Sequence, residues 1–145
     1  MGDLAKEIQS SFTSIKVKAL LNIMYTASWI NTRQVDFFKP YGISPQQYNI
    51  LRILRGSAEP MSVKSVKDRM IERAPNATRL MDKLCVKNLI ERIPCVADRR
   101  VVHIAITTAG LKLLTKIDKD FNQDLLENLT DSEAEQLSVL LDKIR

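Results

Sequence analysis

Glycine is scarce in this chain, which has four in the whole sequence. A phosphate-binding loop needs several glycines at short spacing, so this scarcity excludes that class of nucleotide site. The single histidine, His103, has no cysteine or second histidine at the spacing of a metal site. No nucleophilic side chain is paired with a histidine base at a recognisable spacing. We therefore expect no cofactor and no metal, and we do not expect an enzyme.

Cysteines and long apolar runs are also few. Cys85 and Cys95 are the two cysteines, too few for a disulfide framework. The first residues lack the charged and then apolar layout of a signal peptide. No apolar run approaches the ~18 residues that a membrane helix needs. We expect a cytoplasmic protein with reduced thiols, no membrane contact and a single domain over residues 1–145.

Positive charge is concentrated in one block of the sequence. Ser62 to His103 contains ten Lys or Arg and five Asp or Glu, while the rest of the chain has twelve of each sign. The whole net charge of +5 therefore lies in this block. A basic patch on a compact domain is typical of nucleic-acid binding. The alternative is a module of similar fold that binds another protein without specific DNA binding.

Both ends of the chain carry apolar residues at helical spacing. From residue 4 to Pro40 they recur every three or four positions, which predicts one long helical stretch. Its first apolar positions are Leu4, Ile8, Phe12 and Ile15. Near the other end, Thr107 or Thr108 can cap a helix that reaches residue 125, and residues 130–133 form a capping box for a terminal helix.

The N-terminal helical stretch is too long for a chain of this length to cover on every side. We expect residues 1–40 and 108–145 to provide dimerisation helices. The alternative is a long helix buried in the chain's own core.

Between these ends the sequence predicts a winged helix-turn-helix over residues 44–107, which we call the head. Ser44 and Gln47 form a capping box for a helix that ends near Gly56. A short extended link over residues 59–61 precedes Ser62, which can cap the next helix. The remaining elements are expected at 62–71 (helix), 73–75 (turn), 76–87 (helix), 89–93 (strand) and 101–107 (strand). The fold class is thus mostly α with a small β-hairpin wing.

The helix expected over residues 76–87 has an apolar and a basic face. Apolar residues such as Leu80 and Leu84 share one face, and Asn76, Arg79, Lys83 and Lys87 share the other. A major groove accepts one helix, and Arg or Lys matches the acceptor pair of guanine. The alternative is a solvated face on a surface helix.

The loop between the two strands carries two adjacent arginines, Arg99 and Arg100, at its tip. Arginine suits the narrow, strongly negative minor groove of A·T-rich DNA. Asp98 can accept a hydrogen bond from Arg100 or from loop amides and so hold the loop in shape. The alternative is a solvated charged loop. Along the second strand, Val102, Ile104 and Ile106 are expected to point inward.

Four segments of this region resemble the multiple-antibiotic-resistance regulator (MarR) family. They are Leu80–Leu84, Asn88–Arg92, Asp98–Arg100 and Ile106–Gly110. Asn88 stands where the family usually has glycine, and it tolerates the left-handed conformation that ends a helix. Pro75 and Ala77 also depart from the family pattern and affect the base preference that one would expect.

The resemblance implies a homodimer with interleaved flanking helices and two winged heads that read a palindromic operator, more often as a repressor than as an activator. It implies helix contacts to DNA from Asn76, Thr78, Arg79 and Lys83, and minor-groove contact from Arg100 braced by Asp98. The complete set of residues expected at the DNA is Ser62, Lys64, Arg73, Asn76, Thr78, Arg79, Lys83, Lys87, Asp98, Arg99 and Arg100.

Many members of the family release DNA when a small aromatic or phenolic compound binds. In this sequence Tyr25, Trp29 and Tyr48 could line such a site. Arg33 or Arg52 could then offer a cation to an anionic ligand. The alternative is that these aromatic residues pack in the core or at a dimer interface.

Overall fold

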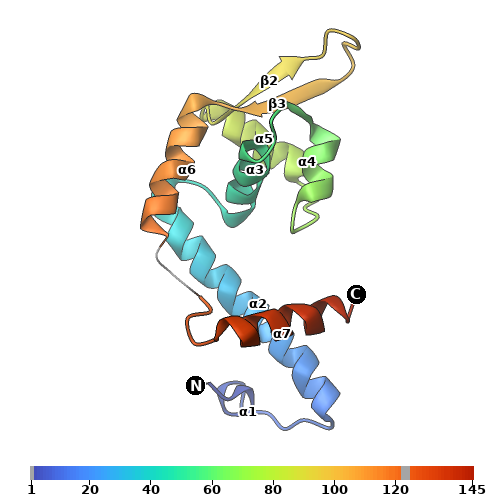
Figure 1. Cartoon of the computed structure of the whole chain (residues 1–145), viewed down its shortest axis with the longest axis vertical. Coiled ribbons are helices and arrows are strands. Elements are labelled where there is room, and N and C mark those ends of the chain that lie inside the picture. The colour runs from blue at the N-terminus through green and yellow to red at the C-terminus, as the bar shows by residue number, and fades with distance from the viewer. Residues whose placement is uncertain (1, 122–124) are drawn as a thin grey trace.

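The computed structural model describes residues 2–121 and 125–145. The protein is mostly helical, with the expected head at one end (Figure 1). A long helix, α2, runs from the head to the opposite end of the molecule; α7 crosses it about midway, and α1 lies near its far end. The elements are α1 (Leu4–Glu7), α2 (Ile15–Phe38), the 3-10 helix η1 (Lys39–Tyr41), α3 (Pro45–Arg55), β1 (Met61–Ser62), α4 (Val63–Arg69), α5 (Ala77–Val86), β2 (Ile90–Pro94), β3 (Val102–Ile106), α6 (Thr108–Asp120) and α7 (Asp131–Asp142).

The N-terminal helical stretch is broken, so the expectation of one helix over residues 4–40 is wrong. Helix α1 stops at Glu7, and Gln9 takes a left-handed backbone with φ 50°. Ser14 then begins α2, where its hydroxyl accepts a hydrogen bond from the Val17 amide at 3.2 Å. Short polar side chains favour such local hydrogen bonds over continued helix, and the run from residue 10 to 14 is rich in them.

Helix α3 begins and ends where the sequence indicates. The capping box is formed, with the Ser44 hydroxyl accepting from the Gln47 amide and the Gln47 side chain accepting from the Ser44 amide. The buried Gln47 amide also donates to the Leu80 carbonyl oxygen at 3.4 Å, so the capping residue links α3 to α5.

The wing is a three-stranded antiparallel sheet in the order β1-β3-β2. Met61 pairs with Ile104 and Ser62 with His103, so the expected extended link contributes a third strand. Ile104 is fully buried, but Val102 is 38% exposed because it lies at the loop end of the hairpin, paired with Pro94 and away from the core. The inward alternation expected along β3 therefore fails at Val102.

The end of α5 and the start of α6 are joined by direct bonds. Asn88 adopts the expected left-handed conformation, with φ 55°. The Thr107 hydroxyl donates to the Asn88 carbonyl oxygen at 2.7 Å, and the Thr107 amide donates to that of Leu89 at 3.1 Å. Thr107 also caps α6 by accepting from the Gly110 amide at 3.0 Å. One residue thus closes the hairpin and starts the next helix.

The C-terminal elements follow the expected caps but not all of the expected lengths. Helix α6 ends at Asp120, and residues 122–124 lie outside the described part, so a helix continuous to residue 125 is not observed. The capping box of Thr130 and Glu133 opens α7 as expected.

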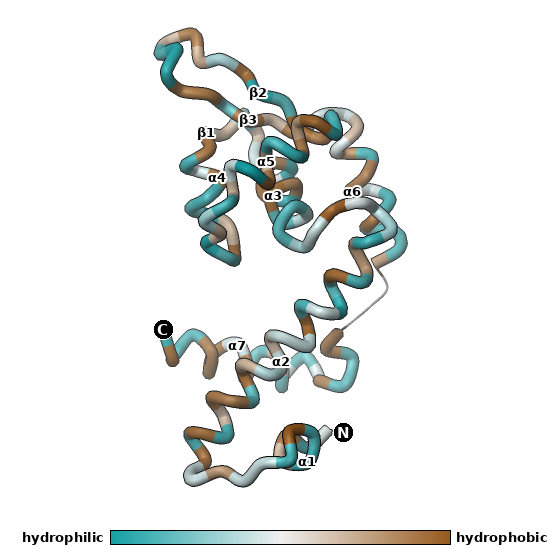
Figure 2. The backbone as a smooth tube through the Cα atoms, turned by 180° about the vertical axis from the view of Figure 1, so that it is seen from behind, coloured by the Kyte–Doolittle hydropathy of each residue, from teal (hydrophilic) through white to brown (hydrophobic). Residues whose placement is uncertain are grey.

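The buried core belongs to the head, the end of α2 and α6, which contributes Leu114 and Ile117. It joins Phe38 of α2, Ile50 and Leu51 of α3, Leu84 of α5 and Ile104 of β3. By contrast, α2 and α7 carry many hydrophobic residues (Figure 2), and several of these, such as Leu20, Met24 and Leu140, are exposed. Among the described residues, no helix is long and apolar enough to cross a membrane.

Candidate nucleic-acid interface

Helix α5 presents opposite faces to the core and to solvent. Ala77, Met81 and Leu84 are buried against α3 and the sheet. Arg79 and Lys83 lie on the exposed face, as the sequence indicates. The helix is therefore fixed by its apolar side and leaves its basic side free to meet another molecule.

The cations of this surface have no counter-charge in the described part of the chain. No ion pair or hydrogen bond engages the side chains of Lys64, Arg73, Arg79, Lys83, Arg99 and Arg100 within it, and all are exposed. Asn76 and Thr78, at the start of α5, are exposed as well. Unpaired cations on a helix face, its preceding turn and a loop tip form a surface suited to an anionic partner.

The wing loop is shaped by the acid that the sequence singles out. Asp98 Oδ1 accepts a hydrogen bond from the Arg100 amide at 2.9 Å, and the Asp98 carbonyl accepts from the Val101 amide at 3.0 Å. The Cys95 amide closes the loop on the Val101 carbonyl at 3.2 Å. Asp98 thus holds the backbone of the loop while the side chains of Arg99 and Arg100 extend into solvent.

Besides Asp98, two other residues expected at the DNA have partners inside the protein. The Ser62 hydroxyl caps α4 by accepting from the Ser65 amide at 3.1 Å. The Lys87 ammonium donates to the Gly42 carbonyl oxygen, at the end of η1. Lys87 therefore ties the C-terminal end of α5 to the loop before α3.

The sequence interpretation missed an ion pair between α5 and the wing. Arg92 of β2 donates to the carboxylate of Asp82, which lies on α5, and about half of each side chain is exposed. Ten positions separate the two residues, so no helix or strand spacing brings them together. The half-buried Cys85 lies beside this pair, and its burial raises the pKa of the thiol.

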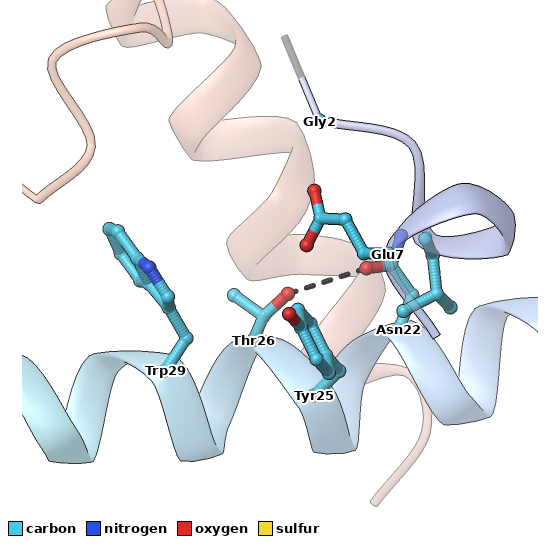
Figure 3. A pocket seen from close by; sticks show the side chains of 7 residues that line it. Gly2, Glu7, Asn22, Tyr25, Thr26 and Trp29 are labelled. Carbon is cyan, nitrogen blue, oxygen red and sulfur yellow. Dashed lines mark hydrogen bonds between the residues drawn. The ribbon is translucent and has the colours of Figure 1, made fainter. Parts of the chain in front are cut away.

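The residues expected to bind a ligand fall into two groups. Tyr48 packs on Phe38 with ring centroids 4.4 Å apart, and the Arg52 guanidinium lies 5.8 Å from the Tyr48 ring. Tyr25 and Trp29, near the middle of α2, instead line a cavity with Glu7 of α1 (Figure 3). Arg33 stacks on Trp29, 4.9 Å from the ring centroid.

An aromatic side chain that the sequence did not single out joins the first group. Phe121, just after α6, lies 5.0 Å from Phe37 and 6.5 Å from both Phe38 and Tyr48 by ring centroids. The result is a cluster of rings where α2, α3 and α6 meet. In the sequence, Phe121 is only one of the apolar positions at helical spacing in the helix expected after Thr107.

Metal chemistry has no donor set in the part of the chain that is described, since no three His, Cys, Asp or Glu side chains gather there as ligands. The structure instead presents a basic surface in two parts, one on α5 and one on the wing loop. The buried core of the head holds α5 in place beneath this surface. A helix-turn-helix with a β-hairpin wing of this kind defines a DNA-binding regulator of the winged-helix class.

Comparison with known proteins gives the family. A family sequence model described as the MarR family matches residues 43–102. The multiple antibiotic resistance protein MarR of Escherichia coli (strain K12) is 30% identical over 115 residues, which cover 75% of this chain and 78% of that protein. The chain belongs to the MarR family of transcriptional regulators and is not an enzyme.

Solved structures agree with this assignment. A MarR transcription factor from Planctomyces limnophilus is 33% identical, has a TM-score of 0.69 and covers 92% of this chain and 98% of its own. A mutant MarR from E. coli complexed with operator DNA is 26% identical, has a TM-score of 0.74 and covers 99% of both chains. The expected fold, mostly α with a small β wing, is thereby confirmed.

Proposed function

We propose that this protein binds a specific double-stranded DNA operator as a homodimer and represses transcription. Helix α5 of each copy would enter a major groove, and the wing loop would reach the neighbouring minor groove. The observation that carries the proposal is the set of exposed cations on α5, its preceding turn and the wing loop, unpaired within the described residues.

The role that we propose for each side chain depends on whether it has a hydrogen-bond partner inside the protein. Arg79 and Lys83 face outward from the first two turns of α5, where base edges would lie, and Arg100 extends from the braced wing loop. The remaining residues proposed to meet DNA are Lys64, Arg73, Asn76, Thr78 and Arg99. In this proposal Ser62, Lys87 and Asp98 position the contacting elements through their own internal bonds.

The homodimer is proposed from the exposed apolar faces at the far end from the wing. On α2 these include Leu20 and Met24, and on α7 Val139 and Leu140. A second copy would cover them, with 1–40 and 108–145 as dimerisation regions of one domain. Two-fold symmetry would place the heads on palindromic half-sites about 34–36 Å apart, one turn of DNA. Acting on DNA, the protein would work in the cytoplasm.

Release by a small aromatic compound is part of the same proposal. The cluster of Phe37, Phe38, Tyr48 and Phe121 lies between the head and the helices that lead away from it. A phenolic ring that took the place of Phe121 would be able to shift α6 against α2. The guanidinium of Arg52 beside Tyr48 would attract an anionic group on such a ligand.

The test is fluorescence anisotropy on DNA from upstream of the protein's own gene, titrated with salt against scrambled DNA of equal length. We expect a preference for the upstream fragment that persists near ~150 mM salt, and a steep loss of affinity as salt rises, because each neutralised phosphate releases counterions. Equal affinity for both fragments would contradict sequence-specific repression. A lack of binding even at low salt would favour a protein-binding module.

A further inference from the structure

The connection between α4 and α5 carries Arg73, one of the cations proposed to contact DNA, on a backbone with little packing of its own. Residues 70–76 form this connection, and most of them are exposed, including Ile71 at 83%. Asn76, which begins α5, makes no capping hydrogen bond with its side chain. Exposed loop backbone with few buried apolar contacts moves readily unless other bonds hold it. The position of Arg73 therefore depends on contacts from elsewhere in the head.

Two side chains of α3 supply such contacts, and both reach the residues directly before Arg73. Asn49 Oδ1 accepts a hydrogen bond from the Ile71 amide at 3.0 Å. The Gln46 side-chain amide donates to the Glu72 carboxylate at 2.9 Å. Gln46 and Asn49 are three positions apart on α3, so they lie on the same face of that helix. We call this pair of bonds the turn brace.

Helix α3 is a firm support for the turn brace because other side chains of this helix lie in the core. Ile50, Leu51 and Leu54 are at most 3% exposed. The buried Gln47 side chain, next to Gln46, binds the Leu80 carbonyl oxygen of α5 at 3.4 Å. One rigid helix thus holds both the connection and the helix that follows it.

We propose that Asn49 and Gln46 are positioning residues for DNA binding and act through Arg73. Their role rests on the proposed function, and neither side chain would itself touch DNA. A guanidinium on a held backbone loses less conformational freedom when it binds a phosphate, so its contribution to affinity is larger. Gln46 also engages the carboxylate of Glu72, which would otherwise be able to pair with Arg73 in place of the phosphate.

A double-mutant cycle on the full-length protein tests the turn brace. Asn49→Leu removes the acceptor for the Ile71 amide and introduces a residue that favours helix more strongly. Affinity for the upstream DNA fragment is measured by anisotropy for wild type, Asn49→Leu, Arg73→Ala and the double variant. We expect each single variant to weaken binding by about fivefold to tenfold, and the double variant by no more than about twofold beyond Arg73→Ala.

The matched control is the same substitution in an Arg79→Ala background. Arg79 lies within α5 and is held by that helix, not by the turn brace. Asn49→Leu should therefore keep its full effect when Arg79 is absent. An effect that disappeared equally in the Arg73→Ala and Arg79→Ala backgrounds would contradict a role through Arg73.

The salt dependence separates positioning from a loss of folded protein. If Arg73 no longer reaches a phosphate, the slope of log K against log salt should flatten by about one in Asn49→Leu, as in Arg73→Ala. Partial unfolding would lower the affinity without changing this slope, and circular dichroism would detect it. Hydrogen exchange of the Ile71 amide, measured without DNA, should be faster in Asn49→Leu than in wild type.

The outcomes distinguish the positioning role from the proposed function. Additive effects of Asn49→Leu and Arg73→Ala, an unchanged salt slope, or equal exchange of the Ile71 amide would each overturn the positioning role alone. Equal binding of wild type to upstream and scrambled DNA would contradict sequence-specific repression, but the cycle would still decide the role of Asn49, because any DNA presents phosphates. A wild-type protein that bound no DNA even at low salt would overturn both.

Discussion

At the scale of single residues, Arg79 is an exposed cation in the first turn of α5, one helical turn before Lys83. If its guanidinium reads a base, Arg79→Ala should cost ~1–3 kcal/mol of operator binding and reduce the preference over scrambled DNA. The measurement is anisotropy on both DNAs at one salt concentration. Lys143→Ala removes one positive charge far from the head and serves as the control.

The two results for Arg79→Ala have different physical meanings. A loss on the operator alone indicates a base contact, whereas an equal loss on both DNAs indicates a phosphate contact and contradicts the base-reading role. No loss on either DNA would remove Arg79 from the proposed interface.

Gly110 is a second residue whose substitution has a predictable effect, in this case on the free energy of unfolding. A Cβ at this position would overlap the Leu89 carbonyl oxygen and lie 2.7 Å from Ile106 Cγ1. Backbone cannot yield as a flexible side chain does, so Gly110→Ala should lower the free energy of unfolding by ~1–3 kcal/mol. Chemical denaturation followed by circular dichroism measures the change.

Gly56 provides the matched control for that substitution. Its backbone is right-handed, with φ −74°, and a Cβ there would make only ordinary contacts, the nearest at 3.5 Å to the Arg52 carbonyl. Gly56→Ala should be neutral or slightly stabilising, because it restricts the unfolded chain. If both variants lost equal stability, close packing at Gly110 would not be the reason.

At the scale of elements, the sequence predicted those features that depend on near neighbours. The caps at Ser44, Ser62 and Thr130 and the left-handed Asn88 lie where expected, because each depends on bonds within a few residues. The break after Glu7 was missed because apolar spacing alone does not register a run of short polar side chains.

Features formed by distant residues were not predicted. β1 pairs with β3 across more than forty positions, and Phe121 meets Tyr48 only because the fold brings α6 to α3. The Arg92–Asp82 pair likewise depends on how the hairpin folds back on α5. For the basic surface, by contrast, composition and helical spacing were sufficient to indicate which face is exposed.

Helix α7 offers a prediction about pH. Hydrogen bonds from the Thr130 amide and hydroxyl lower the pKa of Glu133 below its ordinary value of 4.5. A depressed pKa in the folded state means that the cap contributes stability above the ordinary pKa and loses it as pH falls through the folded one. Protection of α7 amides from hydrogen exchange should therefore decrease on acidification below about pH 4.5.

Glu133→Gln tests whether that carboxylate is responsible. The variant should show little change in α7 protection over the same acid range, whereas Glu135→Gln, an exposed acid of the same helix, should behave as wild type. Identical pH profiles for wild type and Glu133→Gln would refute the prediction.

At the scale of the whole molecule, the proposed dimer predicts that one charge on α7 will separate the copies. Leu140 is 60% exposed in the single chain, so Leu140→Glu should leave the head folded. A buried, unpaired carboxylate at the interface costs several kcal/mol, so the dimer dissociation constant should rise by more than about tenfold. Light scattering during size-exclusion chromatography measures the mass.

Ser138→Glu places the same charge two positions away, on a residue that is already polar and exposed, and serves as the control. Operator affinity should fall for Leu140→Glu, because two linked heads bind more tightly than one. An unchanged dimer in the Leu140→Glu variant would contradict the assignment of α7 to the interface.

The bonds of Thr107 have a mechanical consequence. They fasten the start of α6 to Asn88 and Leu89, the residues that follow α5, and the Arg55–Asp118 ion pair at 2.6 Å fastens α6 to α3 farther along. The head and α6 therefore rotate as one rigid body. A ligand that tilts α6 by a few degrees would turn α5 through the same angle, and the distance between the α5 helices of the two proposed copies would change without any bending inside the head.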